Sequence, residues 1–275
     1  MKKYFLFALI LSLWTGVGCE RRQTTMGEEI ASEETLTEVT DRAIEEIAEL
    51  AMPLPGGGGA PCAGSLEGLG GCAQVTDSGE GVYPRTVVVD FGTGCTSPSG
   101  VTRSGSITWV DSGDLLETVG ATRTCTLTDF AVNNRAVTGT RVRTFTGIND
   151  AGQPTYTFQT ALTIVRNGNT FTRSASGSSI WLSGYDTPEC GDNVVQRDGT
   201  ATVSGPSGNT RTRTFVAVVH DQPCGYPISG TVQIDRPGPD VSIDYGDGTC
   251  DNWATVVRGN NTFLLDLETH TLTPQ

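Results

Sequence analysis

The chain has 275 residues and a formal net charge of −13, because 31 acidic residues outnumber 18 basic ones. This acidic balance argues against nucleic acid as a partner, since phosphate backbones require a basic surface. Both lysines, Lys2 and Lys3, lie at the extreme N-terminus, so chemistry that needs a lysine elsewhere, such as Schiff-base formation, is excluded.

Residues 1–18 have the pattern of an export signal: two lysines, an apolar stretch from Tyr4 to Trp14, and small residues before Cys19. The apolar stretch is short for a permanent membrane span. Small residues followed by a cysteine resemble the lipobox of bacterial lipoproteins. That resemblance implies that Cys19 becomes the acylated N-terminus, carries chains such as palmitate and anchors the protein in membrane lipid. Glu20 favours the outer membrane as the destination.

Eight cysteines favour an oxidising compartment. If Cys19 is acylated, an odd number remains, and Cys190 is the candidate for the unpaired thiol. If Cys19 stays a plain residue, the number is even, and ordinary signal cleavage would give a secreted soluble protein. Both outcomes stay open.

Residues 19–74 are expected to form an arm. A capping box at Thr35 and Glu38, followed by apolar residues at helical spacing, predicts one acidic amphipathic helix over about 35–51. This helix would pack on the rest of the protein or on a partner. "PLPGGGGAP" at 53–61 then predicts a flexible linker.

From residue 75 to 275 the pattern changes to alternating threonine, valine and aromatic residues. The expected strands are 85–91, 103–110, 121–132, 135–146, 154–165, 170–181, 193–204, 209–220, 227–235, 241–246 and 253–267. Expected turn pairs are Asn133-Asn134, Asn167-Gly168, Asp198-Gly199, Ser207-Gly208 and Gly259-Asn260. The sequence therefore predicts a single all-β domain, an antiparallel meander closed as a β-sandwich or roll.

The stretch "VSIDYGDGTCDN" at 241–252 raises the question of calcium, because it crowds Asp244, Asp247 and Asp251 together. An EF-hand loop needs glycine at its sixth position. Counting from Asp244 puts Thr249 there, so that motif fails. Convergence of the three aspartates on a calcium ion stays open, and otherwise no cofactor is expected.

The same stretch suits a disulfide. If 228–234 pairs with 241–245 so that Val232 faces Ile243, then Cys224 and Cys250 fall one residue out of register, and a bulge at Gly225, Pro227 or Gly230 would bring them together. The other expected pairs are Cys62 with Cys72 and, more weakly, Cys95 with Cys125.

Catalytic patterns are sparse, and an enzyme is the less favoured class. The chain has no G-x-S-x-G motif, and its two histidines, His220 and His270, are isolated. A carboxylate pair for glycosidic cleavage stays open. Its candidates are Asp111, Asp114, Glu117, Asp186, Glu189 and Asp192.

Two arginine pairs, Arg141 with Arg143 and Arg211 with Arg213, each project from one face of a strand. If the two strands were neighbours, they would form a cationic stripe for phosphate, sulfate or uronate groups. The alternative is cross-strand pairing with carboxylates. Trp109, Trp181 and Trp253 would line a sugar-binding face or fill the core.

The stretches "VDFGTGCTSPSGVTRSGSI", "CGYPISGTVQI" and "IDYGDGTCDNWATV" resemble a group of uncharacterised bacterial envelope lipoproteins. The resemblance covers about a quarter of the chain and implies a tethered all-β domain after a variable arm, with no established activity. The expected function is that of a lipid-anchored outer-membrane protein with a structural or binding role toward glycan or another envelope protein. The alternatives are a carbohydrate-active enzyme with a carboxylate pair and a secreted soluble β-protein.

Overall fold

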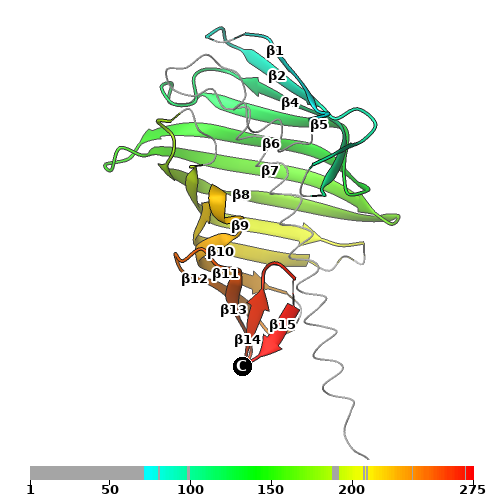
Figure 1. The fold of residues 1–275 in the computed structure, drawn as a ribbon, viewed down its shortest axis with the longest axis vertical. Helices are drawn as coiled ribbons and strands as arrows, with labels where there is room; N and C mark the ends of the chain where they lie inside the picture. The colour runs from blue at the N-terminus through cyan, green and yellow to red at the C-terminus, as the bar shows by residue number, and fades with distance from the viewer. Residues whose placement is uncertain are drawn as a thin grey trace, which may run out of the picture.

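A computed structural model describes residues 71–79, 81–97, 100–187, 192–206, 208, 210–236, 238–269 and 271–275. The signal, Cys19, the predicted helix, the linker, Cys62, Glu189, Cys190 and His270 lie outside these residues. The described chain forms one antiparallel sheet in which nearly every strand pairs with the next one in sequence (Figure 1). The expected all-β antiparallel meander is confirmed. Within the described ranges, no helix combines the length and the apolar character needed to cross a membrane.

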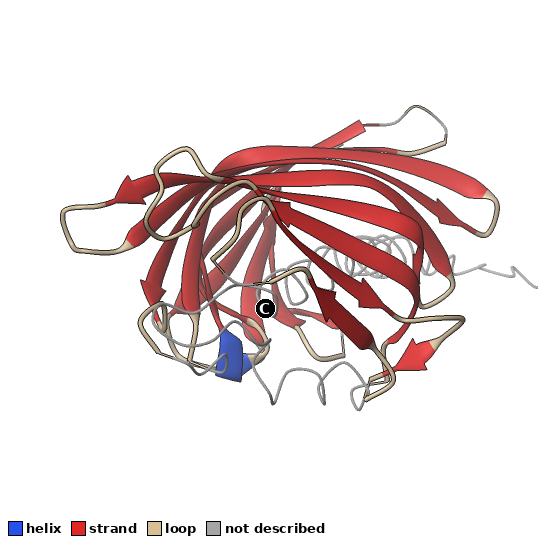
Figure 2. Ribbon diagram, turned by 90° about the horizontal axis from the view of Figure 1, so that it is seen from above, coloured by secondary structure: helices blue, strands red, loops and turns tan. Residues whose placement is uncertain are grey.

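The strands are β1 Gln74–Asp77, β2 Arg85–Asp90, β3 Cys95–Thr96, β4 Thr102–Asp111, β5 Thr122–Val132, β6 Arg135–Ile148, β7 Pro154–Arg166, β8 Asn169–Ser183, β9 Val194–Ser204, β10 Thr210–Asp221, β11 Pro227–Asp235, β12 Val241–Asp247, β13 Trp253–Arg258, β14 Asn261–Asp266 and β15 Thr271–Pro274. A short 3-10 helix, η1, spans Gln222–Cys224 between β10 and β11. The two-residue strand β3 pairs only with β4, beside the main order of the sheet. The sheet is strongly curved (Figure 2).

Ten expected strands, from 85 to 246, agree with β2 and β4–β12 to within two residues at either end. The single strand expected over 253–267 is wrong, because the chain reverses at Gly259-Asn260, the predicted turn pair, which joins β13 to β14 and in which Gly259 has φ +56°. The short strands β1, β3 and β15 were not predicted, since two to four residues give too little alternation to detect.

Two of the predicted turns have the backbone that their residues favour. Asn133 and Asn134 both have positive φ between β5 and β6, and Asn167 with Gly168 repeats this between β7 and β8. Positive φ at both central positions is the type I′ geometry that matches strand twist. Asp198-Gly199 is instead inside β9, where Gly199 pairs with Gly177 and Asp198 accepts a hydrogen bond from the Ala217 amide, 2.8 Å away.

The sheet has two unlike faces. The inner face carries the alternating buried residues of each strand, such as Val87, Trp109 and Ile243, and the outer face carries the other set. Inner-face residues of β2–β8 form one apolar cluster around Trp109, and those of β10–β14 form another around Ile243. A third cluster packs Leu115, from the β4–β5 connection, with Phe145, Tyr156 and Trp181. Burial of the inner face therefore fixes the register of the sheet.

The expected disulfide between Cys224 and Cys250 is present. Val232 faces Ile243 as predicted, and a register shift between Ser229 and Thr231 sets two residues of β12, Tyr245 and Gly246, opposite Gly230. The extra residue therefore lies on β12 rather than at the positions expected on β11. Cys224 lies in η1 and Cys250 follows the end of β12, so the two cysteines meet beyond the regular ladder of the two strands.

The other two expected pairings are wrong. Cys72 bonds to Cys95, with their Cα atoms 5.6 Å apart, so Cys72 is not available to Cys62. Cys125 is free and buried. Cys95 lies opposite Arg103 of β4, whereas Cys125 lies opposite Trp109, six residues further along the same strand. That separation is far beyond the reach of a disulfide. Burial raises the pKa of the Cys125 thiol to about 12, which keeps it protonated.

Candidate functional site

The outer face of the central strands presents hydroxyl groups in register. Thr140, Ala161, Ser174 and Thr202 form one row across β6–β9. Val142, Gln159, Ser176 and Thr200 form the next row. Alternation puts these side chains on one face of the sheet, and the ladder places them about 4.8 Å apart from strand to strand.

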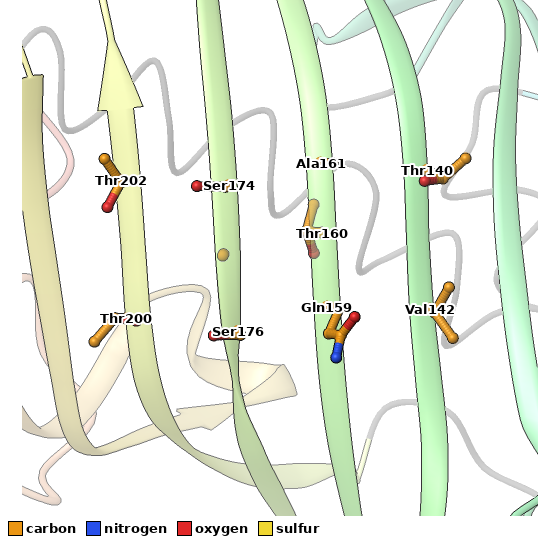
Figure 3. A pocket seen from close by; sticks show the side chains of 10 residues that line it. Thr140, Val142, Gln159, Thr160, Ala161, Ser174, Ser176, Thr200 and Thr202 are labelled. Atoms are coloured by element: carbon orange, nitrogen blue, oxygen red, sulfur yellow. The ribbon is translucent and has the colours of Figure 1, made fainter.

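These two rows line an open hollow of about 430 Å³ (Figure 3). Its lining contains no charged residue; threonine and serine hydroxyls, one amide and small apolar groups make up the surface. Hydroxyls also pair between neighbouring strands, as between Thr202 and Thr212, whose Oγ1 atoms are 3.2 Å apart. Each hydroxyl both donates and accepts, so the hollow is suited to a polar, uncharged ligand.

The inner face of the same strands is cationic. Arg141 of β6 and Arg213 of β10 end a single row whose middle members are Thr160, Ala175 and Ala201. The two strands are therefore not neighbours, because β7, β8 and β9 separate them, and the stripe expected from adjacent strands is corrected to a row about 19 Å across.

Three arginines of the inner face lie over aromatic rings of the same face. The Cζ atom of Arg143 lies 3.7 Å from the centroid of the Tyr156 ring, and Arg141 lies over Phe158 at 5.7 Å. Arg213 lies 5.9 Å from the centroid of Phe215. Stacking on a ring stabilises a cation that has lost part of its hydration. Burial lowers the pKa of Arg213, while Tyr245 opposes this shift, and an arginine nevertheless remains protonated in proteins.

The aspartates of the 241–252 stretch do not form a metal site. Asp244 accepts a hydrogen bond from the Gly246 amide at 2.9 Å, and Asp251 does the same for the Trp253 amide. Asp247 accepts from both the amide and the hydroxyl of Thr249, which lowers the pKa of its carboxyl. Each side chain thus caps its own turn. Across the described residues, no group of histidine, cysteine or carboxylate side chains is placed to hold a metal ion.

The carboxylates considered for glycosidic cleavage have structural contacts. Asp111 is buried against Arg123, Asp114 accepts from the amides of Leu116 and Glu117, and Asp192 accepts from the Thr187 hydroxyl. These contacts hold the three carboxylates in turns and strand pairs, and Asp114 and Asp111 both lie near enough to Tyr83 to help burial raise the pKa of its phenol.

The remaining candidates from the sequence are the tryptophans and the histidines. Trp109 and Trp181 are buried in the core, whereas Trp253, on β13, is exposed. His220 lies on β10 opposite Val195 and Pro227. The hollow was not predicted from the sequence. The pattern that could have indicated it is the alternation of threonine and serine along β6–β10.

The sequence and structure matched no protein-family model, no curated protein and no solved structure.

Proposed function

We propose that this protein is a lipid-anchored protein of the bacterial outer membrane whose β-sheet is a non-catalytic binding domain for a neutral glycan. The observation that carries the binding role is the uncharged, hydroxyl-lined hollow on the outer face of β6–β9. The anchoring role is supported by the N-terminal sequence, with its apolar stretch and small residues before Cys19. Two disulfides, Cys72–Cys95 and Cys224–Cys250, are consistent with an oxidising compartment.

A neutral glycan is the partner chemistry that best suits the hollow. Its hydroxyls exchange hydrogen bonds with threonine, serine and amide groups without the desolvation cost of a charged ligand. The hollow is open, and the exposed Trp253 lies several strands away on β13. Individual contacts are therefore expected to be weak, and display of many copies on a membrane would strengthen binding through multivalency.

Anchoring is tested by mass spectrometry of the N-terminal peptide from the natively expressed protein. Acyl chains on Cys19 are expected, and the Cys19→Ala variant should leave the membrane fraction. An unacylated, freely diffusing wild-type protein would contradict the anchoring.

Glycan binding is tested with the full mature chain on an array of neutral and charged glycans. The Thr200→Val/Thr202→Val variant removes two hydroxyls of the hollow with little change in volume, and a loss of about tenfold in affinity is expected. Thr255→Val, on the outer face of β13 several strands from the hollow, is the matched control and should bind normally. Selective binding of charged glycans, or equal binding by both variants, would exclude the hollow as the site.

A further inference from the structure

The inner face of the five central strands concentrates positive charge. Six of its arginines are Arg141 and Arg143 of β6, Arg173 of β8, Arg197 of β9, and Arg211 and Arg213 of β10, and Arg135 at the start of β6 shares this face. By register, all six share the face that also carries Thr160 and Ala201. None of the described inner-face positions on β6–β10 is an aspartate or a glutamate.

Part of this charge is held away from water, because Arg173 and Arg213 are each 7% exposed, whereas the other four arginines are partly buried. Each of the six arginines makes at least one hydrogen-bonding, ring or electrostatic contact, so the distinguishing property of the face is its summed charge. Towards the other end of the sheet, Arg85 and Arg123 pair with aspartates of neighbouring strands. Positive charge at low local dielectric favours an anionic occupant strongly.

The chain itself carries a complementary segment. Residues 28–49 contain nine carboxylates, one arginine and no lysine, and their apolar residues recur at helical spacing. A helix with this pattern would offer carboxylates to the arginines and apolar side chains to the partly buried Phe158 and Phe215 between them.

The intervening chain is long enough to reach. Residues 50–70 separate this segment from Gly71, the first described residue, and an extended chain spans roughly 3.3 Å or more per residue, or about 70 Å in all. Eight strand-to-strand steps along the sheet, from β1 to β10, cover only about 38 Å.

We propose that residues 28–49 bind to the inner face of β6–β10 in the same chain, with their carboxylates against Arg141, Arg143, Arg211 and Arg213. The acidic segment would then cover the cationic inner face of the sheet, and the hydroxyl-lined hollow would stay open on the outer face. This inference is independent of the glycan proposed for the outer face.

Hydrogen exchange of the full mature chain tests the contact. Amides of residues 28–49 are expected to exchange at least about tenfold more slowly than in a free synthetic peptide of the same sequence, as several ion pairs imply. Glu38→Gln/Glu45→Gln/Glu46→Gln/Glu49→Gln, and separately Arg141→Gln/Arg213→Gln, should each abolish the difference, as should about 0.5 M salt. Glu268→Gln and Arg236→Gln, which change the same residue types elsewhere, are the matched controls.

Three results would overturn the inference. They are exchange as fast as in the free peptide, slow exchange that survives both charge variants, and slow exchange that appears only at high protein concentration, which would assign the contact to a second copy. The glutamine substitutions in residues 38–49 leave the sheet sequence intact, so they decide the question even if the arginine variant fails to fold.

Discussion

Asp111 and Arg123 illustrate what a single ion pair contributes in this sheet. The pair joins β4 to β5 on the inner face, with Nε to Oδ1 at 2.6 Å and Nη2 to Oδ2 at 2.7 Å. Both side chains are almost fully buried. Asp77 and Arg85 form a similar pair between β1 and β2, but Asp77 is 22% exposed. Removing one partner of a buried pair strands the other charge, whereas solvent screens the loss of an exposed one.

We therefore expect Asp111→Asn to lower the free energy of unfolding by about 3 to 5 kcal/mol, because Arg123 would keep its charge in a buried place. Asp77→Asn, the matched change at a carboxylate that is 22% exposed, should cost less, because water reaches this position and Arg85, although buried, also lies opposite Asp111 in the β2–β4 register. Urea denaturation followed by circular dichroism measures both. Equal losses in the two variants would show that burial does not set the value of these pairs.

At the scale of elements, irregular positions decide how the strands fit. Gly230 of β11 lies where β10 and β12 both leave regular register, and its φ is +91°. A Cβ atom there would lie 2.3 Å from the carbonyl oxygen of Ala217. Both the backbone conformation and the close approach require glycine. One glycine therefore accommodates the irregular pairing of β11 with both of its neighbours.

Gly230→Ala should destabilise the protein by at least about 2 kcal/mol more than Gly152→Ala, because overpacking against backbone adds to conformational strain. Gly152, in the β6–β7 connection, is the matched control, since its φ is +80° and its Cβ would meet nothing within 4 Å. Thermal or urea unfolding gives the comparison. Similar losses at the two positions would mean that strain alone, and not the contact with Ala217, makes Gly230 necessary.

The whole molecule has apolar clusters at both ends of a continuous sheet. The cluster around Trp109 and the cluster around Ile243 share no residue. Between them, the inner face of β8 and β9 carries small residues at Ala175, Gly177 and Gly199, while the third cluster, with Trp181 and Val195, packs further along the same two strands. Where the residues are small they bury little apolar area, so side-chain packing between the two end clusters is locally weak.

Local unfolding is accordingly expected to differ between the two ends. The Cys224→Ser/Cys250→Ser variant loses a cross-link worth about 2 to 4 kcal/mol and should lose hydrogen-exchange protection in β10–β14, while β2–β7 keep theirs. Asp111→Asn should give the opposite pattern. Loss of protection throughout the sheet in both variants would instead indicate one cooperative unit.

The sequence by itself determined the ten strands β2 and β4–β12, several of the tight turns and the register of β11 with β12. Each depends on local chemistry: alternation of period two, residues that accept positive φ, and apolar side chains facing each other across a hairpin. The sequence also predicts an export signal over residues 1–18 and acylation of Cys19, and both stay predictions.

Only the tertiary structure decided which distant residues meet. Cys72 with Cys95, the row from Arg141 to Arg213, and the hollow over β6–β9 each depend on the summed registers of several strand pairs. A single bulge moves a side chain to the opposite face, and bulges leave little trace in the sequence. Errors in a register predicted from sequence therefore accumulate with every added strand. In the folded sheet, hydrogen bonds and burial of the inner face set all the registers together.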